Sequence, residues 1–303
     1  MAYVERSGNR IVIVAGDSVP AVKRPVYMLR TLFAYLSELW DYRELLFSLV
    51  MRDLKVRYRN SVLGVLWSLG NPLLMMAVFT VVFTVMTPTN IEKFPIFVLC
   101  GLLPWNFFSA SVNGSIRAVV DNAPLVRKVY FPREMLPISI VLANLVNFLI
   151  ALGVLFAFIL AFRLPLTAWA LLLPAVIVVQ TVFAVGIALI LSTANVFYRD
   201  TQVIMEVVIL AWFFLTPIFY PIDALPHNYH IGNVTIDVWR WMYLVNPMAS
   251  LVATYRVILY GSGFGGAPPA FDFFLRTAIT AFGVLAFGMV VFHRYKRLFG
   301  EEV

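Results

Sequence analysis

Long stretches without a single charged residue limit the folds open to this sequence more than any other feature. Charge-free runs occupy residues 62–86, 94–116, 135–162 and 164–198, and shorter ones cover 207–222 and 277–292. A helix needs about 20 mostly apolar residues to cross a bilayer. The chain is also 61% hydrophobic and 13% charged, whereas soluble proteins carry about 25% charged residues. The sequence therefore excludes a soluble globular protein and predicts an integral membrane protein.

These runs predict an all-α fold with six membrane-spanning helices. The two shorter runs reach about 20 residues when their polar neighbours at 201–206 and 273–276 are included. Pro165 and Pro174 lie near the start of the run 164–198, which favours one helix there rather than two. The predicted spans are about 62–86, 94–116, 135–162, 169–193, 201–222 and 273–292.

The distribution of Lys and Arg predicts the orientation of the spans. With the N-terminus inside, 18 of the 23 Lys and Arg residues fall on the cytoplasmic side and five on the outer side. Positive charge concentrates in cytoplasmic connections, so both termini are predicted to be cytoplasmic. Residues 1–35 lack the pattern of a signal peptide and are expected to be a cytoplasmic extension, and residues 293–303 a cytoplasmic tail.

Residues 36–61 are predicted to form an amphipathic helix in the membrane interface. Polar residues recur at spacings of three and four, and a second stripe at the same spacing includes Leu46, Val50 and Leu54. Two such faces are typical of a helix that lies on the bilayer surface. Its cations are expected to face lipid phosphate or solvent, and they are Arg52, Lys55, Arg57 and Arg59.

Asn71-Pro72 interrupts the first predicted span. Proline removes one backbone donor and crowds the carbonyl four residues earlier, here that of Ser68. The pair predicts a kink. One hypothesis is that the span bends there during function, and the other is that the kink is static and only shapes packing.

The centres of the six predicted spans contain no ionisable residue, and Glu206 lies only near the start of the fifth. Ionisable groups in spans mark ion or proton pathways, so the pattern disfavours a proton- or sodium-coupled transporter. Asn144 and Asn147 share one helical face, which predicts interhelical hydrogen bonds or a role in lining a pathway. The sequence has no G-x-x-x-x-G-K-[ST] motif, so this chain is not expected to bind ATP through a P-loop.

The predicted outer loop, 223–272, is too apolar for a plain surface loop. Residues 238–245 are rich in aromatic side chains, and 248–260 contain a single charge, Arg256. Apolar stretches of this length are too short to cross and are typical of re-entrant or interfacial segments. We therefore expect re-entrant helices between the fifth and sixth spans, with a surface-lying hairpin as the alternative.

The same loop holds the residues that could suggest a metal or catalytic site. His227 and His230 lie near Asp223 and Asp237, with Arg240 close by in the sequence. Two histidines three residues apart in an external loop are more typical of a plain surface, so no metal site is predicted. An integral membrane transferase would have to use this sparse set. Cys100 is the only cysteine, which excludes a disulfide within the chain.

Five segments together resemble the permease subunits of type-2 ABC exporters. Within that family they are most similar to the branch that exports lipid-linked polysaccharides such as O-antigen, capsule and teichoic acid. The segments occur in order over a region from about residue 40 to the C-terminus, and they are RDLKVRYRNSVLGVLWSLGNPLL (52–74), NAPLVRKVYFPREMLP (122–137), NVFYRD (195–200), FLTPIFYP (214–221) and LVNPMA (244–249).

The resemblance implies partners and a coupling element. It implies a homodimer of this chain, bound to two copies of a cytoplasmic P-loop ATPase that holds ATP and Mg²⁺, with no cofactor in this chain. Membrane lipids and a lipid-linked glycan are the other expected partners, and nucleic acid is not one. The loop 118–134 matches the element that transmits ATP-driven motion, and its expected contact residues are Asn122, Arg127, Lys128, Tyr130, Arg133 and Glu134.

The resemblance also implies a translocation path along the dimer axis, lined by the first and fifth spans. Aromatic rings can offer an apolar face to sugar C–H groups. The alternative for each ring is to face lipid or to pack between helices. The candidates are Trp67, Phe79, Phe83, Trp212, Phe213, Phe214, Phe219 and Tyr220.

The function expected from this resemblance is ATP-driven export of a lipid-linked polysaccharide from the cytoplasmic side of the bacterial inner membrane. A type-2 ABC exporter of a lipid or drug is the alternative. An integral membrane transferase is a more distant one.

Overall fold

The computed structural model describes residues 2–7, 10–15, 41–59, 67–86, 91–166, 168–222, 225–226, 229–231, 234–261 and 271–303. The chain divides into two compact units, residues 1–45 and 46–303. The first contains an antiparallel hairpin, in which β1 (Ala2–Ser7) pairs with β2 (Arg10–Ala15). The sequence had not predicted these strands. Alternating β-branched residues such as Val4, Val12 and Val14 favour such strands.

Five helices of the second unit are long and apolar enough to cross a membrane, counted over the described residues. They correspond to the first four and the last of the predicted spans. The first continues from α3 into a π-helix, and the fourth begins with a 3₁₀ turn. The helices are α3 (Trp67–Val81) with η3 (Val82–Met86), α4 (Phe94–Ile116), α6 (Met135–Ala161), η4 (Ala168–Leu172) with α7 (Leu173–Phe197), and α11 (Phe271–Tyr295).

The predicted fifth span, 201–222, was too long as a helix. The helix α8 (Thr201–Leu215) has 15 residues, which corresponds to about 22 Å at about 1.5 Å per residue and is shorter than the roughly 30 Å hydrocarbon core. It ends because Thr216 precedes Pro217 and is extended, with φ −97° and ψ 132°. A following proline disfavours helical geometry. The chain from 216 to 221 is therefore non-helical.

Two helices at a sharp angle follow this segment. α9 (Val238–Val245) and α10 (Pro247–Leu259) meet at 101° around Asn246, and α10 is almost wholly buried. A pair bent this strongly fits the predicted re-entrant arrangement better than a straight span. A small hairpin of β3 (Tyr229–Ile231) and β4 (Val234–Ile236) precedes α9, and the sequence had not predicted it.

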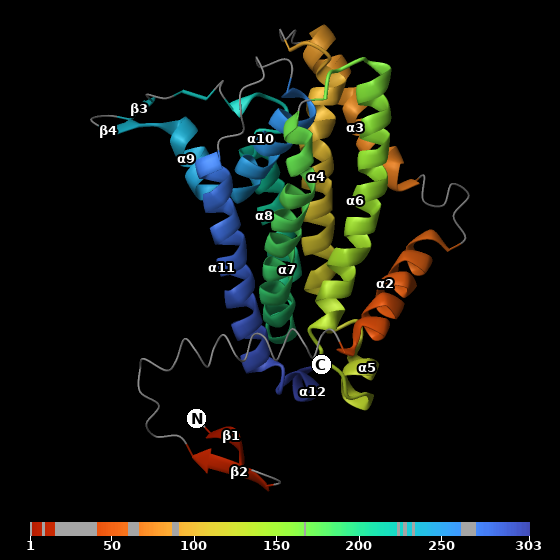
Figure 1. The fold of residues 1–303 in the computed structure, drawn as a ribbon, viewed down its shortest axis with the longest axis vertical. Helices are drawn as coiled ribbons and strands as arrows, with labels where there is room; N and C mark the ends of the chain where they lie inside the picture. The colour runs from red at the N-terminus through yellow and green to blue at the C-terminus, as the bar shows by residue number, and fades with distance from the viewer. Residues whose placement is uncertain are drawn as a thin grey trace. The chain divides into compact units, whose positions relative to one another are not determined.

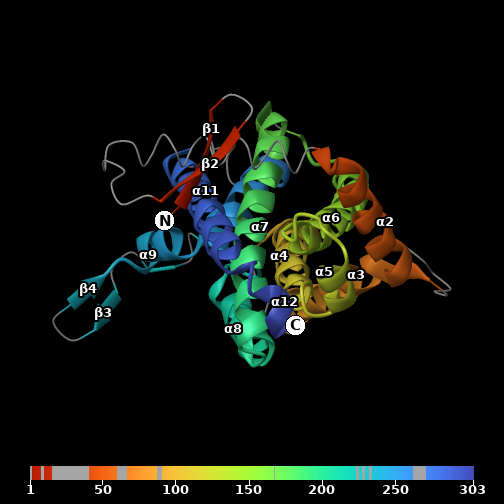
Figure 2. The same ribbon diagram turned by 90° about the horizontal axis from the view of Figure 1, so that it is seen from below.

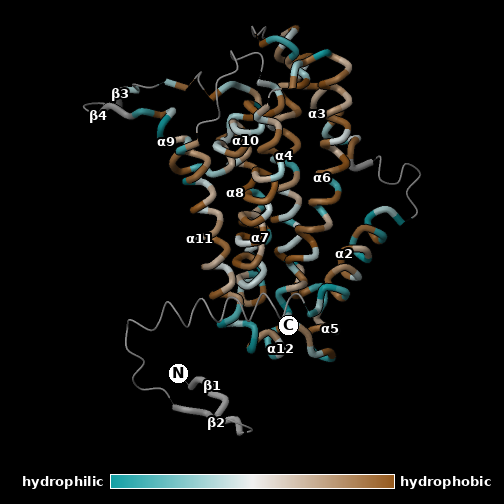
Figure 3. Tube along the Cα trace, viewed as in Figure 1, coloured by the Kyte–Doolittle hydropathy of each residue, from teal (hydrophilic) through white to brown (hydrophobic). Residues whose placement is uncertain are grey.

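Within the second unit, α4 is the central helix. It packs against α3, α6, α7, α8 and α10, and it is mostly buried, whereas little of α3 or α11 is. Figures 1 and 2 show these helices side by side, with α11 against α7 and α3 on the far side of α4. Figure 3 shows hydrophobic residues along most of their length and more hydrophilic ones at the end where α12 lies.

Three shorter helices lie in the predicted interface helix, in the predicted coupling loop and in the predicted cytoplasmic tail. They are α2 (Arg43–Tyr58), α5 (Ala123–Lys128) and α12 (Phe299–Glu302). Figure 1 shows α5 and α12 at one end of the bundle and α9 at the opposite end. We refer to these as the α5 end and the α9 end.

Candidate functional site

The coupling loop forms a compact element, but its predicted contact residues do not share one surface. Arg127 and Lys128 in the last turn of α5 are exposed, and Tyr130 just after it is 92% exposed. Arg133 is partly buried and Glu134 is 0% exposed. The first three residues therefore form an exposed surface, while the last two turn into the protein.

Arg133 and Glu134 contact the C-terminal segment. Nη1 of Arg133 donates to the carbonyl of Lys296, and its Nη2 donates to the carbonyl of Val126 in α5 at 3.4 Å. Nζ of Lys296 lies 3.0 Å from Oε1 of Glu134. The two contacts with Lys296 join parts of the chain more than 160 residues apart in the sequence.

The helix α2 binds the bundle through its polar residues. Arg57 donates to Oδ1 of Asn144 at 2.7 Å, and the Tyr58 hydroxyl donates to Oδ1 of Asn147 at 2.5 Å. The two asparagines of α6 thus form the predicted interhelical hydrogen bonds. Arg57 is exposed, as expected for a cation of this helix, and its guanidinium also binds Asn144 of α6.

A second polar contact joins α2 to the start of α5. Nη1 of Arg52 donates to Oδ1 of Asn122 at 2.9 Å, and Arg52 also pairs with Asp53 at 2.9 Å. Ser139 of α6 donates to Oδ2 of Asp53 at 3.2 Å. Lys55 and Arg59 are exposed, as the polar stripe predicts. The interface helix and the coupling loop, predicted as separate elements, are therefore in direct contact.

Most of the predicted aromatic path residues pack against one another within the chain. The ring of Phe219 lies 4.1 Å from that of Phe79, 6.1 Å from that of Phe83 and 5.1 Å from that of Phe213, between centroids. Trp212 contacts Phe108 at 5.1 Å. Within one chain, these ring contacts pack α3, α4 and α8 against the non-helical segment 216–221.

The remaining three path candidates differ from this group. Phe214, on α8, has a side chain that is 64% exposed. Tyr220 is partly buried, and its carbonyl accepts a hydrogen bond from Arg256. Trp67 begins α3, but its side chain lies outside the described residues. Phe214 is thus the described candidate that most clearly faces away from its own chain.

Arg256 of α10 satisfies the backbone that follows α8, a role that the sequence did not predict. It is 5% exposed. Its guanidinium donates to the carbonyls of Pro217, Ile218 and Tyr220, the last at 3.1 Å. Its Cζ lies 3.8 Å above the ring of Phe97. The signal that could have found it is its position as the single charge in an apolar stretch that follows Asn246-Pro247.

Asn246 also satisfies polar groups of this segment, at the point where α8 ends. Its Nδ2 donates to the Leu215 carbonyl at 3.2 Å and to Oγ1 of Thr216 at 3.1 Å. Its Oδ1 accepts from Nε1 of Trp212 at 2.8 Å and caps α10 through the backbone N–H of Ala249 at 3.2 Å. The segments FLTPIFYP and LVNPMA are therefore two halves of one junction, in which side chains satisfy the backbone where α8 ends.

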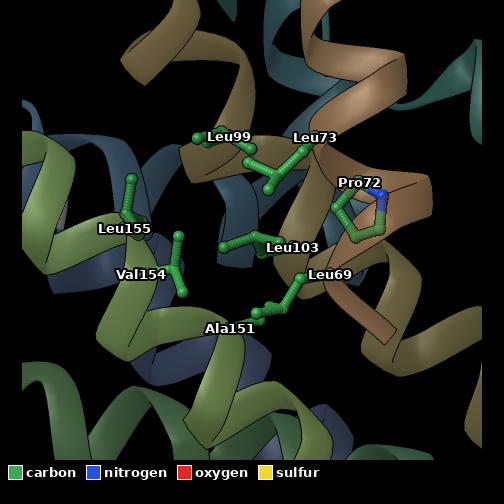
Figure 4. Close-up of a pocket in the computed structure, with 8 residues that line it drawn as sticks. All are labelled: Leu69, Pro72, Leu73, Leu99, Leu103, Ala151, Val154 and Leu155. Atoms are coloured by element: carbon green, nitrogen blue, oxygen red, sulfur yellow. The ribbon is translucent and has the colours of Figure 1, made fainter. Parts of the chain in front are cut away.

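Pro72 lies within a helix that continues past it, from Trp67 to Val81. Asn71 is exposed, whereas Pro72 is buried beside a small apolar pocket between α3, α4 and α6. Figure 4 shows the proline ring at the edge of this pocket, opposite leucine side chains of α4. The pocket is lined by Leu69, Pro72, Leu73, Leu99, Leu103, Ala151, Val154 and Leu155. Whether α3 bends there during function stays a hypothesis.

In the part of the chain that the structure describes, no group of three His, Cys, Asp or Glu residues could hold a metal ion. Asp223 and His227, two members of the set weighed as a metal or transferase site, lie outside the described residues.

These features define a multi-pass helical membrane protein. The ABC-2 type transporter family matches residues 44–260, and the chain belongs to that family. The match confirms the resemblance to type-2 ABC exporter permeases.

Relatives named as polysaccharide or O-antigen transport proteins match most of the chain. It is 40% identical over 232 residues to the O-antigen export system permease protein RfbA of Myxococcus xanthus, covering 77% of this chain and 86% of that protein. It is 30% identical over 259 residues to an O-antigen export system permease protein RfbA of Klebsiella pneumoniae, covering 85% and 94%. It is 25% identical over 228 residues to the polysialic acid transport protein KpsM of Escherichia coli, covering 69% and 78%.

Proposed function

We propose that this chain is the transmembrane subunit of an ATP-driven exporter that carries a lipid-linked polysaccharide across the bacterial inner membrane. The observation that supports it most is the 40% identity to an O-antigen export permease over 77% of the chain. The spans supply the path, and hydrolysis of ATP with Mg²⁺ takes place in a separate P-loop ATPase.

The ATPase docks at the α5 end, which is the cytoplasmic side in this proposal. Arg127, Lys128 and Tyr130 form an exposed mixed surface of cations and one aromatic ring, as a docking element requires. Arg52 and Asn122 join α5 to α2, so a force on α5 also reaches the interface helix. The assembly is a dimer of this chain with two ATPase copies.

The dimer contact and the path involve α3 and α8. Both helices expose large apolar side chains along one side, including Leu74 and Val78 on α3 and Val203 and Val207 on α8. Such faces suit lipid or a second copy of the chain. In the proposed homodimer they border the axis along which the glycan passes.

The proposed function is tested by deleting the gene in its own organism and following the surface polysaccharide. We expect the glycan to disappear from the cell surface and to accumulate on its lipid carrier inside. Complementation requires both this chain and an ATPase subunit that co-purifies with it. Intact surface glycan together with the loss of efflux of a lipid or a drug would instead support the alternative exporter class.

Phe214 provides a test of the aromatic path. We expect Phe214→Ala to lower polysaccharide export severalfold, because one ring that can stack on a sugar is lost, while the melting temperature in detergent stays unchanged. Phe213→Ala should instead lower the melting temperature, since that ring packs against Trp105 at 5.6 Å and Phe219 at 5.1 Å.

The matched control for Phe214 is Phe282→Ala. Phe282 is 54% exposed on α11, which is not one of the helices assigned to the path. Equal export by Phe214→Ala and Phe282→Ala would remove Phe214 from the path.

A further inference from the structure

The C-terminal helix α12 packs closely against the bundle. Phe299 is 0% exposed, and its ring lies 5.1 Å from that of Phe292 in α11 and 6.2 Å from that of Phe197 in α7. Tyr295 also contacts Phe197, at 5.5 Å. This short helix is therefore fixed to the ends of two long spans.

The same segment holds α5 through Arg133. One arm of the guanidinium binds the Lys296 carbonyl just after α11, and the other binds the Val126 carbonyl inside α5. Val126 is itself buried. Helix α12 contacts both α5 and α7, and Figure 2 shows it beside α5 when the bundle is viewed from the α5 end. Arg133 thus connects the coupling helix to the end of the last span.

A charged pair completes the contact. The Lys296 ammonium lies 3.0 Å from Oε1 of Glu134, whose side chain is 0% exposed, while that of Lys296 is 24% exposed. Removing a carboxylate from water carries a desolvation penalty, and the attraction to a buried partner does not always offset it. Such a pair is therefore a weak source of stability, and fixing one arrangement of the chain is the role that its geometry suits better.

We infer that Arg133, Glu134, Lys296 and Phe299 form a C-terminal clamp that fixes the coupling helix α5 to α7 and α11, so that the ATPase moves these spans when it moves α5. The inference rests on the proposed function and adds residues 296–299 to its coupling machinery. These are positioning residues, because the exposed face of α5 remains the one that contacts the partner.

Loss of the clamp should leave binding of the ATPase intact while polysaccharide export is lost. Without it, α5 still presents Arg127, Lys128 and Tyr130, so the ATPase should bind and hydrolyse ATP. Its motion, however, should no longer reach the spans. We expect Lys296→Met to retain ATPase co-purification and ATP hydrolysis but to lower export of the organism's own surface polysaccharide by about tenfold or more, the effect of about 1.4 kcal/mol of lost coupling.

Three further variants separate positioning from simple stability. The double variant Glu134→Gln with Lys296→Met removes both charges, so it should restore any lost folded yield but not export. Lys296→Arg keeps the pair and should keep export. Arg297→Met changes an exposed neighbouring cation and should export as the parent protein does.

The outcomes also distinguish this inference from the proposed function. A parent protein that neither binds an ATPase nor exports glycan would overturn the proposed function itself. A parent complex that exports, together with Lys296→Met and double-variant complexes that export equally well, would overturn the clamp alone. Export restored by the double variant would likewise overturn it, because the pair would then serve stability only.

Discussion

Arg256→Met should almost abolish the folded protein in the membrane. The substitution keeps a long side chain but removes every hydrogen bond to the carbonyls of Pro217, Ile218 and Tyr220. An unsatisfied buried polar group costs about 1–3 kcal/mol, and total stabilities are only about 5–15 kcal/mol. Three unsatisfied carbonyls would therefore remove much of the protein's folding free energy. The measurement is the yield of monodisperse protein in mild detergent and its melting temperature.

The matched control for this experiment is Arg240→Met. Arg240 lies in the neighbouring helix α9 with an exposed side chain, so we expect yield and melting temperature close to those of the parent. Arg256→Lys should be intermediate, because an ammonium keeps the charge but cannot reproduce the planar fork of donors. Equal yields from Arg256→Met and Arg240→Met would show that the carbonyls find other partners.

The surroundings of Arg256 explain why a cation can remain buried there. The face of Phe97 lies 3.8 Å from Cζ and offers a cation–π contact. Gly101 provides the room, because a Cβ at that position would come within 3.1 Å of Nη2. Non-helical backbone inside a membrane domain survives only where protein or water satisfies it. Arg256 and Asn246 supply hydrogen-bond donors for the backbone of residues 215–220.

The long spans could be predicted from the sequence because their signal is local. Twenty apolar residues in a row need a helix wherever they lie in a bilayer, and α4 spans the predicted residues 94–116. The end of α8 was also within reach of the sequence. Pro217 makes Thr216 a poor helical residue, whereas the absence of charge up to Ile222 predicts a longer span.

The contacts that build the candidate sites could not be predicted in this way. The bond from Arg133 to Lys296 spans 163 positions and that from Arg57 to Asn144 spans 87, and no periodicity encodes such a pairing. The aromatic residues show the same limit. Phe213 and Phe214 are adjacent in the sequence, yet one is packed and the other faces outward, because neighbouring residues on a helix point about 100° apart.

The second large effect is expected where α7 and α11 cross. A Cβ on Gly288 of α11 would lie 2.5 Å from the carbonyl oxygen of Gly186, and a Cβ on Gly186 would lie 2.7 Å from the backbone nitrogen of Leu285. Small residues allow membrane helices to approach this closely. Gly288→Ala should therefore force the two backbones apart and cost about 1–3 kcal/mol, measured as a lower melting temperature and folded yield.

Gly283→Ala is the control, because Gly283 lies on the same helix and a Cβ there has nothing within 4 Å. Alanine favours helices by about 1 kcal/mol over glycine, so this variant should melt at the parent temperature or slightly above it. The two variants therefore differ in whether the added Cβ meets the backbone of α7 or open space. If the Gly288→Ala protein had the same melting temperature as the Gly283→Ala protein, α11 would be able to shift freely along α7. A shift of that kind would also carry Lys296 away from Arg133, since α11 ends one residue before Lys296, and the close crossing is what holds the clamp in register.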